Sequence, residues 1–201
     1  MVAAPDKFRG TASAAAVAAA MARSVVEAGG FALEVPMADG GEGTLEALGG
    51  RNRTSRVTGP LGGPVEAAWR LDGSTAVIEM ALASGLVLAG GQEGNRALDA
   101  TTAGTGELIR LAVEQGARRV LVGLGGSATT DGGLGALRAM GSPARYRGVD
   151  LVVACDVRTS FIAAAEGFGP QKGASPAEVG FLRRRLEFLA QTYERDYGVA
   201  V

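Results

Sequence analysis

The sequence of 201 residues contains no histidine and a single cysteine, Cys155. Without histidine, Ser-His-Asp and Cys-His catalysis and histidine metal sites are excluded. Acid–base chemistry is therefore left to Asp, Glu, Lys or Tyr. A zinc site usually needs clustered Cys or His and is disfavoured, whereas magnesium takes oxygen ligands and remains open. One cysteine cannot form a disulfide within the chain, so we expect a reducing compartment.

Lysine is scarce too, because the chain has 18 arginines and only two lysines, Lys7 and Lys172. Both lysines lie in glycine-flanked loops rather than on expected helix faces. Where a surface charge suffices, this chain uses arginine, so a compact ammonium at these two positions suggests a chemical requirement. With only two residues, chance is the alternative explanation.

Long apolar runs and an excess of one charge are also absent. No stretch of 18 strongly apolar residues predicts a transmembrane helix. The alanine-rich residues 14–22 follow Lys7 and Arg9 as in a signal peptide, but alanine makes a weak apolar segment, so we expect a cytoplasmic protein. The net charge is -1 and the only basic run, residues 183–185, falls on an expected helix. We therefore predict no nucleic-acid or membrane partner.

Glycine is abundant, at 32 residues, and the pattern between the glycine clusters alternates strands with helices. Strands are expected at residues 1–5, 31–36, 119–123 and 149–155, with a meander at 54–58, 65–71 and 75–80. Helices are expected at 13–28, 101–116, 134–140 and 175–193. This alternation predicts an α/β fold with a largely parallel sheet and helices on both faces. We place a domain boundary between residues 1–80 and a Rossmann-like segment at 81–201.

The glycine-rich loop at residues 123–135 reads G-L-G-G-S-A-T-T-D-G-G-L-G and joins a strand to a helix. Glycines let the backbone N–H groups approach an anion, and a helix N-terminus favours negative charge. A tight turn with Asp131 as a helix cap is the alternative. A partial dinucleotide fingerprint lies in the same loop, but no acidic residue is well placed for a ribose. The candidate phosphate-binding residues are Gly125, Gly126, Ser127, Thr130, Gly132 and Gly133.

Two further loops follow expected strands and carry charged side chains. Asp39 and Glu42 bracket two glycines and could bind a divalent ion or accept a proton from a substrate hydroxyl. Lys7 and Arg9 lie where a charged substrate could be held. A solvated turn that caps the next helix is an equal alternative for the first loop.

Smaller candidates are spread along the chain. Lys172 lies in a loop before the final helix, and Thr105 belongs to a hydroxyl-rich helix start. Glu79 and Asp156 lie near the ends of apolar strands, where parallel sheets present functional groups. Helix capping or structural pairing is an alternative for each of these residues.

Six of these segments occur in the order typical of one family. They read A-P-D-K-F-R-G, A-D-G-G-E-G-T, T-T-A-G-T-G-E-L-I, G-L-G-G-S-A-T-T-D-G-G, V-A-C-D-V and F-G-P-Q-K-G-A. Together they resemble the glycerate kinase type-1 family. The resemblance implies ATP-dependent phosphorylation of D-glycerate with magnesium, by two α/β domains that flank a cleft.

Within that resemblance we assign hypothetical roles. Catalytic residues are Asp39, Asp131 and Lys7. Substrate-binding residues are Arg9, Glu42, Thr105 and Lys172. Metal ligands are Asp131, Glu79 and Asp156.

The chain also departs from the family. Family members are nearly twice as long, and two internal stretches, after Met140 and after Val157, are short here. The alternative is therefore a catalytically incomplete fragment or a nucleotide- or anion-binding module. A dinucleotide-dependent oxidoreductase is a distant third hypothesis. An exposed sheet edge would favour a homo-oligomer.

Overall fold

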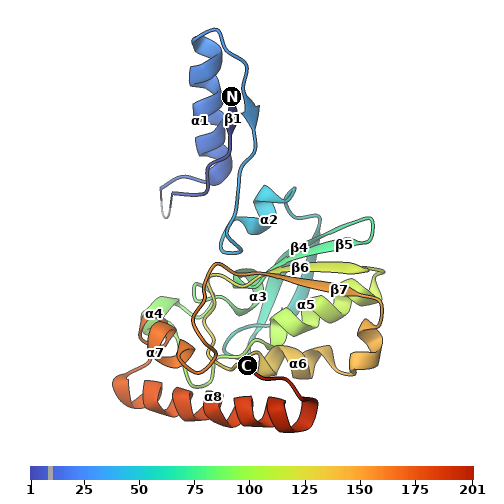
Figure 1. Ribbon diagram of the computed structural model, residues 1–201, viewed down its shortest axis with the longest axis vertical. Coiled ribbons are helices and arrows are strands. Elements are labelled where there is room, and N and C mark those ends of the chain that lie inside the picture. Colours follow the sequence, from blue (N-terminus) through green and yellow to red (C-terminus); the bar gives the residue numbers. More distant parts are fainter. Residues whose placement is uncertain (9–10) are drawn as a thin grey trace.

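The computed structural model describes residues 1–8 and 11–201. Figure 1 shows an N-terminal unit, residues 1–36, that stands away from the body, residues 44–201. The N-terminal unit holds β1 (Val2–Ala3), α1 (Ala14–Glu27) and β2 (Leu33–Glu34), and β1 pairs with β2 in parallel. Residues 37–43, which we call the connecting loop, link the unit to the body.

Local sequence explains why α1 forms. Ser13 caps the helix, because its hydroxyl accepts a hydrogen bond from the Ala16 N–H, and alanine has the highest helix propensity. The helix ends before Gly29, whose φ of 80° suits glycine alone. Strand β2 is shorter than the expected strand at 31–36, because β1 gives it only two residues to pair with.

The body contains a five-stranded sheet in the order β3-β4-β5-β6-β7. Strands β5, β6 and β7 run parallel, whereas β3, β4 and β5 pair antiparallel as the expected meander requires. The predicted α/β fold is therefore confirmed, with a sheet that is parallel only in part. The proposed boundary at residue 80 runs between β5 and β6 of this sheet and stays a prediction. The strands are β3 (Arg53–Thr58), β4 (Pro64–Asp72), β5 (Thr75–Glu79), β6 (Arg119–Gly123) and β7 (Asp150–Ala154).

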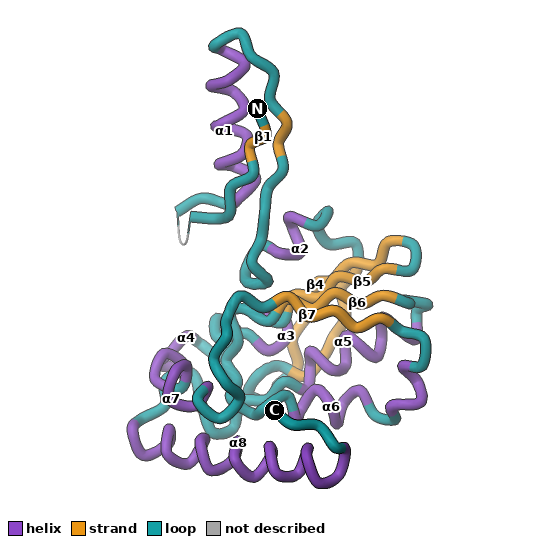
Figure 2. Tube along the Cα trace, in the orientation of Figure 1, coloured by secondary structure: helices purple, strands orange, loops and turns teal. Residues whose placement is uncertain are grey.

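The main core lies between this sheet and α5 (Ala103–Glu114). Trp69, Ile78 and Val120 of the sheet are fully buried there with Leu108 of α5. Burying a side chain of this size contributes about 1.5–3 kcal/mol. Figure 2 shows α5 and α6 (Leu134–Met140) on one side of the sheet and α2 (Thr44–Ala47) on the other. Helices thus flank both faces, as predicted.

The remaining elements surround the lower part of the body in Figure 1. Helix α8 begins at a capping box formed by Ser175 and Glu178, and its Leu182, Leu186 and Leu189 form a second core. None of the helices in the described part of the chain has the length and hydropathy needed to span a bilayer. These elements are α3 (Ala81–Ser84), α4 (Gly91–Gly94), η1 (Pro143–Tyr146), α7 (Ala164–Phe168), η2 (Pro170–Lys172) and α8 (Pro176–Tyr197).

Candidate functional site

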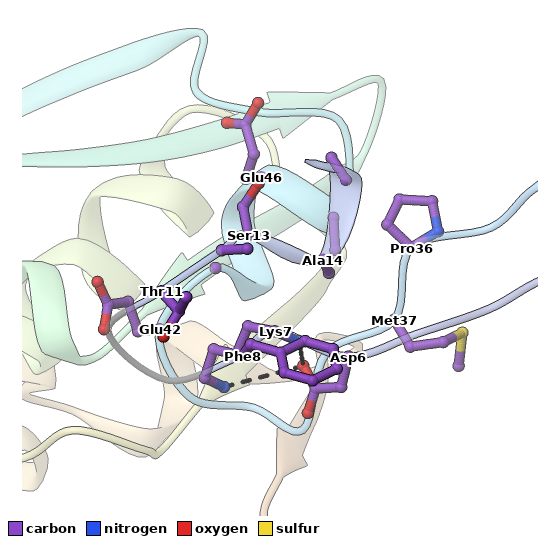
Figure 3. A pocket seen from close by; sticks show the side chains of 14 residues that line it. Asp6, Lys7, Phe8, Thr11, Ser13, Ala14, Pro36, Met37, Glu42 and Glu46 are labelled. Carbon is purple, nitrogen blue, oxygen red and sulfur yellow. Dashed lines mark hydrogen bonds and ion pairs between the residues drawn. The ribbon is translucent and has the colours of Figure 1, made fainter. Parts of the chain in front are cut away.

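A pocket of about 310 Å³ opens between the loop after β1 and the segment after β2 (Figure 3). The first turns of α1 and α2 complete its wall. Its charged and hydroxyl-bearing lining residues are Asp6, Lys7, Thr11, Ser13, Glu42 and Glu46. The pocket therefore has the small size and mixed polarity that suit a small polar molecule.

Lys7, which lines this pocket, forms an ion pair with Asp39, which is not one of the lining residues. The Lys7 Nζ donates to Asp39 Oδ1 at 2.9 Å, and the Gly41 N–H donates to the same oxygen at 2.8 Å. The Lys7 hydrogen bond, followed by the Gly41 hydrogen bond, lowers the pKa of Asp39. Asp39 is therefore ionised at neutral pH. Both of these hydrogen bonds are made to Oδ1.

Glu79 ends β5 and fixes the start of α2. Its two carboxylate oxygens accept hydrogen bonds from the N–H groups of Gly43, at 3.3 Å, and Leu45, at 3.0 Å. Burial raises the pKa of Glu79, which is only 3% exposed. The side chain thus holds the pocket wall beside Glu42, while its role as a metal ligand stays a prediction.

Glycines bring the connecting loop against the carboxyl ends of β6 and β7. The Gly125 N–H donates to the Gly40 carbonyl at 2.9 Å. A Cβ at Gly125 would lie 2.3 Å from the Gly41 Cα, and one at Gly123 would lie 2.5 Å from the Gly40 oxygen. The glycine-rich loop therefore begins directly beside the loop that carries Asp39.

Asp131 joins the starts of two helices. Its Oδ2 accepts from the Thr102 N–H at 2.9 Å, the Thr102 hydroxyl at 2.8 Å and the Gly135 N–H at 3.1 Å, and its Oδ1 accepts from the Gly133 N–H at 3.1 Å. The Thr102 hydroxyl in turn accepts from the Ala136 N–H. This network supports the capping interpretation of Asp131 and positions the end of the glycine-rich loop.

The Thr105 side chain also forms a hydrogen bond within the protein. Its hydroxyl lies 2.9 Å from the Ser84 hydroxyl, and both residues are buried. This contact ties α5 to α3. The substrate-binding role predicted for Thr105 stays untested, and the structure gives the residue a structural partner.

Lys172 reaches the glycine-rich loop from η2. Its Nζ donates to the Ser127 hydroxyl at 2.9 Å and to the Thr129 carbonyl. Burial lowers the pKa of Lys172 to about 8, against a smaller opposing effect of Asp131. The structure thus brings together two predicted site residues, Lys172 and Ser127, that are 45 positions apart.

The remaining candidates lie apart from one another. Asp156 is exposed after β7, and Arg9 lies outside the described residues. Among residues 1–8 and 11–201, no three Asp, Glu or Cys side chains gather closely enough to hold a metal ion. The predicted ligands Asp131, Glu79 and Asp156 therefore do not form a shared cage.

Asn95 is a contributor that sequence reasoning missed. Its side-chain amide donates to the carbonyls of Ala128, at 2.9 Å, and Lys172, at 2.7 Å. It therefore fastens the glycine-rich loop to η2. A lone asparagine between Gly94 and Arg96 has no motif around it, so only the folded structure reveals this role.

Comparisons with known proteins give a consistent result over the whole chain. The model of the glycerate kinase family matches residues 1–144 and 141–201. The glycerate 2-kinase of Escherichia coli K12 is 38% identical over 240 residues, and the glycerate kinase of Bacillus subtilis 168 is 39% identical over 237 residues. These alignments cover 100% and 98% of this chain, and 63% and 62% of the relatives.

A solved structure agrees with these relatives. It is a crystal structure of a protein assigned as glycerate kinase 2 from Salmonella typhimurium LT2. The match has a TM-score of 0.81 and 36% sequence identity, and it covers 98% of this chain and 64% of the other. The chain thus spans just under two thirds of the length of the proteins it matches.

Proposed function

The chain belongs to the glycerate kinase family, and from this premise we propose that it transfers the γ-phosphate of ATP to a hydroxyl of D-glycerate. The observation that carries the proposal is the Lys7–Asp39 ion pair at the pocket, held against the start of the glycine-rich loop by the Gly125–Gly40 hydrogen bond. Phosphoryl transfer depends on positioning and on charge neutralisation. A charged pair beside a candidate phosphate-binding loop can contribute to both.

The pocket side chains take complementary parts in this proposal. Lys7 attracts the glycerate carboxylate, and Arg9, predicted for the same task, lies outside the described residues. Asp39 accepts the proton of the attacking hydroxyl through its Oδ2, while the Lys7 ammonium holds the Asp39 side chain in place and lowers its pKa. Glu42 lines the pocket and can accept a hydrogen bond from the other glycerate hydroxyl.

The glycine-rich loop holds the nucleotide phosphates in this proposal, through Gly125, Gly126, Ser127, Thr130, Gly132 and Gly133. We assign Asp131 to the positioning of that loop, because four donors already occupy its carboxylate. A network of this kind lets the loop meet a phosphate without rearranging.

Magnesium, when bound, neutralises charge on the phosphoryl group. The described residues fit an ion held mainly by phosphate oxygens and water, because no three-carboxylate group is present among them. Of the three predicted ligands, Asp156 is the one whose carboxylate accepts no hydrogen bond within the described part of the chain, and we propose it as a protein ligand.

The free, exposed thiol of Cys155 supports a reducing, cytoplasmic location.

The alternative is that this chain binds a nucleotide or another anion and does not catalyse a reaction. The relatives carry more than a third of their length outside the aligned region. Kinase activity of this chain is therefore a proposal that does not follow from the names of the relatives. The dinucleotide-dependent oxidoreductase is set aside, because the relatives are kinases by name.

A coupled ADP-release assay with D-glycerate, ATP and magnesium tests the proposal. We expect glycerate-dependent turnover, and a drop of about 10²–10⁴-fold in kcat for Asp39→Asn, the range typical of losing a general base. Asp72→Asn is the control, because Asp72 pairs with Arg70 at the surface. No glycerate-dependent turnover in the folded chain would overturn the kinase proposal and leave the binding module.

A further inference from the structure

Lys172 is a partly buried cation without a carboxylate in contact. Lys7, the other lysine, lies 2.9 Å from Asp39 and 4.0 Å from Asp6. No ion pair in the described part of the chain includes Lys172. Asp131 acts on it only from a distance, and four donors already share that carboxylate. Even partial removal of a charge from water is costly unless the charge is paired, so the missing partner calls for an explanation.

Hydrogen bonding around Lys172 leaves several donors without an acceptor. Two of the three ammonium hydrogens go to the Ser127 hydroxyl and the Thr129 carbonyl. An ammonium cannot accept, so the Ser127 oxygen is the acceptor and its own hydrogen remains for another group. Among the described residues, no group accepts that hydrogen, the third ammonium hydrogen or the N–H groups of Gly126 and Ser127.

A buried hydroxyl in the same loop is also unpartnered. Thr130 is 7% exposed, and its Oγ1 has no hydrogen-bond partner within the part of the chain that the structure describes. Buried polar groups are normally paired. A cation and several donors without acceptors therefore gather in one loop segment, and an anion is the ligand that satisfies both.

Lys172 is held in place before any ligand arrives. Asn95 ties its backbone carbonyl to that of Ala128. The next residue, Gly173, has a φ of 87°, and a Cβ there would lie 2.3 Å from the Gln92 carbonyl oxygen, so η2 presses closely on α4. The Phe168 ring centroid lies 6.0 Å from the Nζ. These anchors limit the reorganisation that ligand binding would require.

We infer that Lys172, with the Ser127 hydroxyl and the N–H groups of Gly126 and Ser127, binds a phosphate group of the nucleotide. This inference rests on the proposed kinase function, and it moves Lys172 from glycerate binding to nucleotide binding. The molecule then divides its two lysines between two anions: Lys7 serves the carboxylate in the pocket, and Lys172 serves the polyphosphate. A phosphorylated product offers the same chemistry, so the test must separate the two sources.

Tripolyphosphate is the probe, because it carries the phosphates without adenosine and needs no turnover. Binding to the whole chain is measured at pH 7 by calorimetry and by the shift in thermal unfolding midpoint. We expect saturable binding to the wild type and at least tenfold weaker binding to Lys172→Met. Lys7→Met and Arg183→Met should bind as the wild type does, because Lys7 lines the pocket after β1 and Arg183 pairs with Glu166 at the surface.

Several results would overturn the inference. They are no binding to the wild type at millimolar tripolyphosphate, equal binding to Lys172→Met, or loss of binding in Lys7→Met instead. A Lys172→Met variant that binds tripolyphosphate normally but loses 3-phosphoglycerate would make this a product site, which also overturns it.

If Lys172→Met does not fold, a second variant still tests the inference. Ser127→Ala retains the cation and removes one donor, and we expect severalfold weaker tripolyphosphate binding with the chain still folded. Unchanged affinity in Ser127→Ala would contradict the inferred contact. None of these measurements uses glycerate, so failure of the kinase proposal shows separately, as absent ADP release.

Discussion

Asp39 has a lowered pKa, and the ammonium hydrogen bond from Lys7 is the largest cause of that shift. Removing that ammonium should raise the pKa of Asp39 toward its usual value. Asp39 must be ionised to accept a proton, so the acid limb of the activity profile follows this pKa. We therefore expect Lys7→Met to move the acid limb of kcat/KM to higher pH, in addition to weakening glycerate binding.

The pH profile separates this effect from simple damage to the fold. Arg183→Met removes a comparable cation that pairs with Glu166 at the surface, and it should leave the acid limb where it is. An acid limb that stays in place in Lys7→Met would show that Asp39 is not the group whose ionisation limits the rate.

Lys172 makes a prediction about stability whose sign is opposite to that of a lysine paired with a carboxylate. Its pKa falls from 10.5 to about 8 on folding, chiefly because burial disfavours the ammonium. Below pH 8 both states hold the proton, and the full cost of the buried charge is present. Between pH 8 and 10.5 the folded state loses the proton first, so stability rises with pH.

A comparison with Lys172→Met isolates this residue from other titrating groups. We expect the difference in unfolding free energy, wild type minus variant, to increase between pH 8 and 10.5. The upper limit of the increase is about 3 kcal/mol. Urea denaturation at several pH values measures it. A difference that does not change with pH would mean that Lys172 is solvated in the folded chain.

At the residue scale, sequence reasoning found the charged groups but not their partners. The scarcity of lysine drew attention to Lys7 and Lys172, and each makes contacts with other predicted site residues. The Lys172–Ser127 contact joins segments 45 positions apart, and no local pattern encodes such a distance. Asp131 was predicted as a catalytic residue and a metal ligand, with a helix cap as the alternative, but its contacts with Thr102 became visible only in the folded structure.

At the scale of elements, the site depends on two loops that touch through glycine backbones. A Cβ on Gly125 would lie 2.3 Å from the Gly41 Cα, closer than carbon atoms can pack. Gly125→Ala must therefore push the connecting loop away from the end of β6. We expect a stability loss of about 1–3 kcal/mol, the range for overpacking, and a larger fall in kcat than stability alone explains, because Asp39 moves with its loop.

Gly63→Ala is the matched control for that substitution. Gly63 has no heavy atom within 4 Å of an added Cβ, so the change should stay within about 0.5 kcal/mol of the wild type. Thermal unfolding and the ADP-release assay compare the two variants. Equal behaviour of Gly125→Ala and Gly63→Ala would contradict the close contact of the loops.

Element positions in the body were predictable because local chemistry marks them. The apolar run of β6, the capping residues of α8 and the turns of the meander all lie in the sequence itself. Helices α3 and α4 were not predicted, since four residues each in a glycine-rich stretch leave no periodicity to read. The antiparallel half of the sheet followed from short connections, which only hairpins allow.

At the scale of the whole molecule, the N-terminal unit differs from the body in how much apolar surface it buries. A two-stranded sheet is not stable without further packing. Strands β1 and β2 pack on α1, whereas parallel sheets are normally covered on both faces. Here Phe31 is 82% exposed, and Met1, Val2, Val26 and Leu33 are each at least half exposed. A homo-oligomer was predicted from an exposed sheet edge, and β1 and β2 with this apolar surface are where a second copy would pair or pack.

That prediction is tested by the concentration dependence of the oligomeric state. We expect sedimentation velocity to show self-association that rises with concentration, and Phe31→Ser with Leu33→Lys to shift the chain toward monomer. Both side chains are exposed, so the variant should keep its unfolding midpoint. Phe188→Ser is the control, because Phe188 is exposed on α8 of the body. If Phe188→Ser dissociates the assembly and the β2-side variant does not, the contact lies on the body, and the N-terminal unit must instead be stabilised by its own packing on α1.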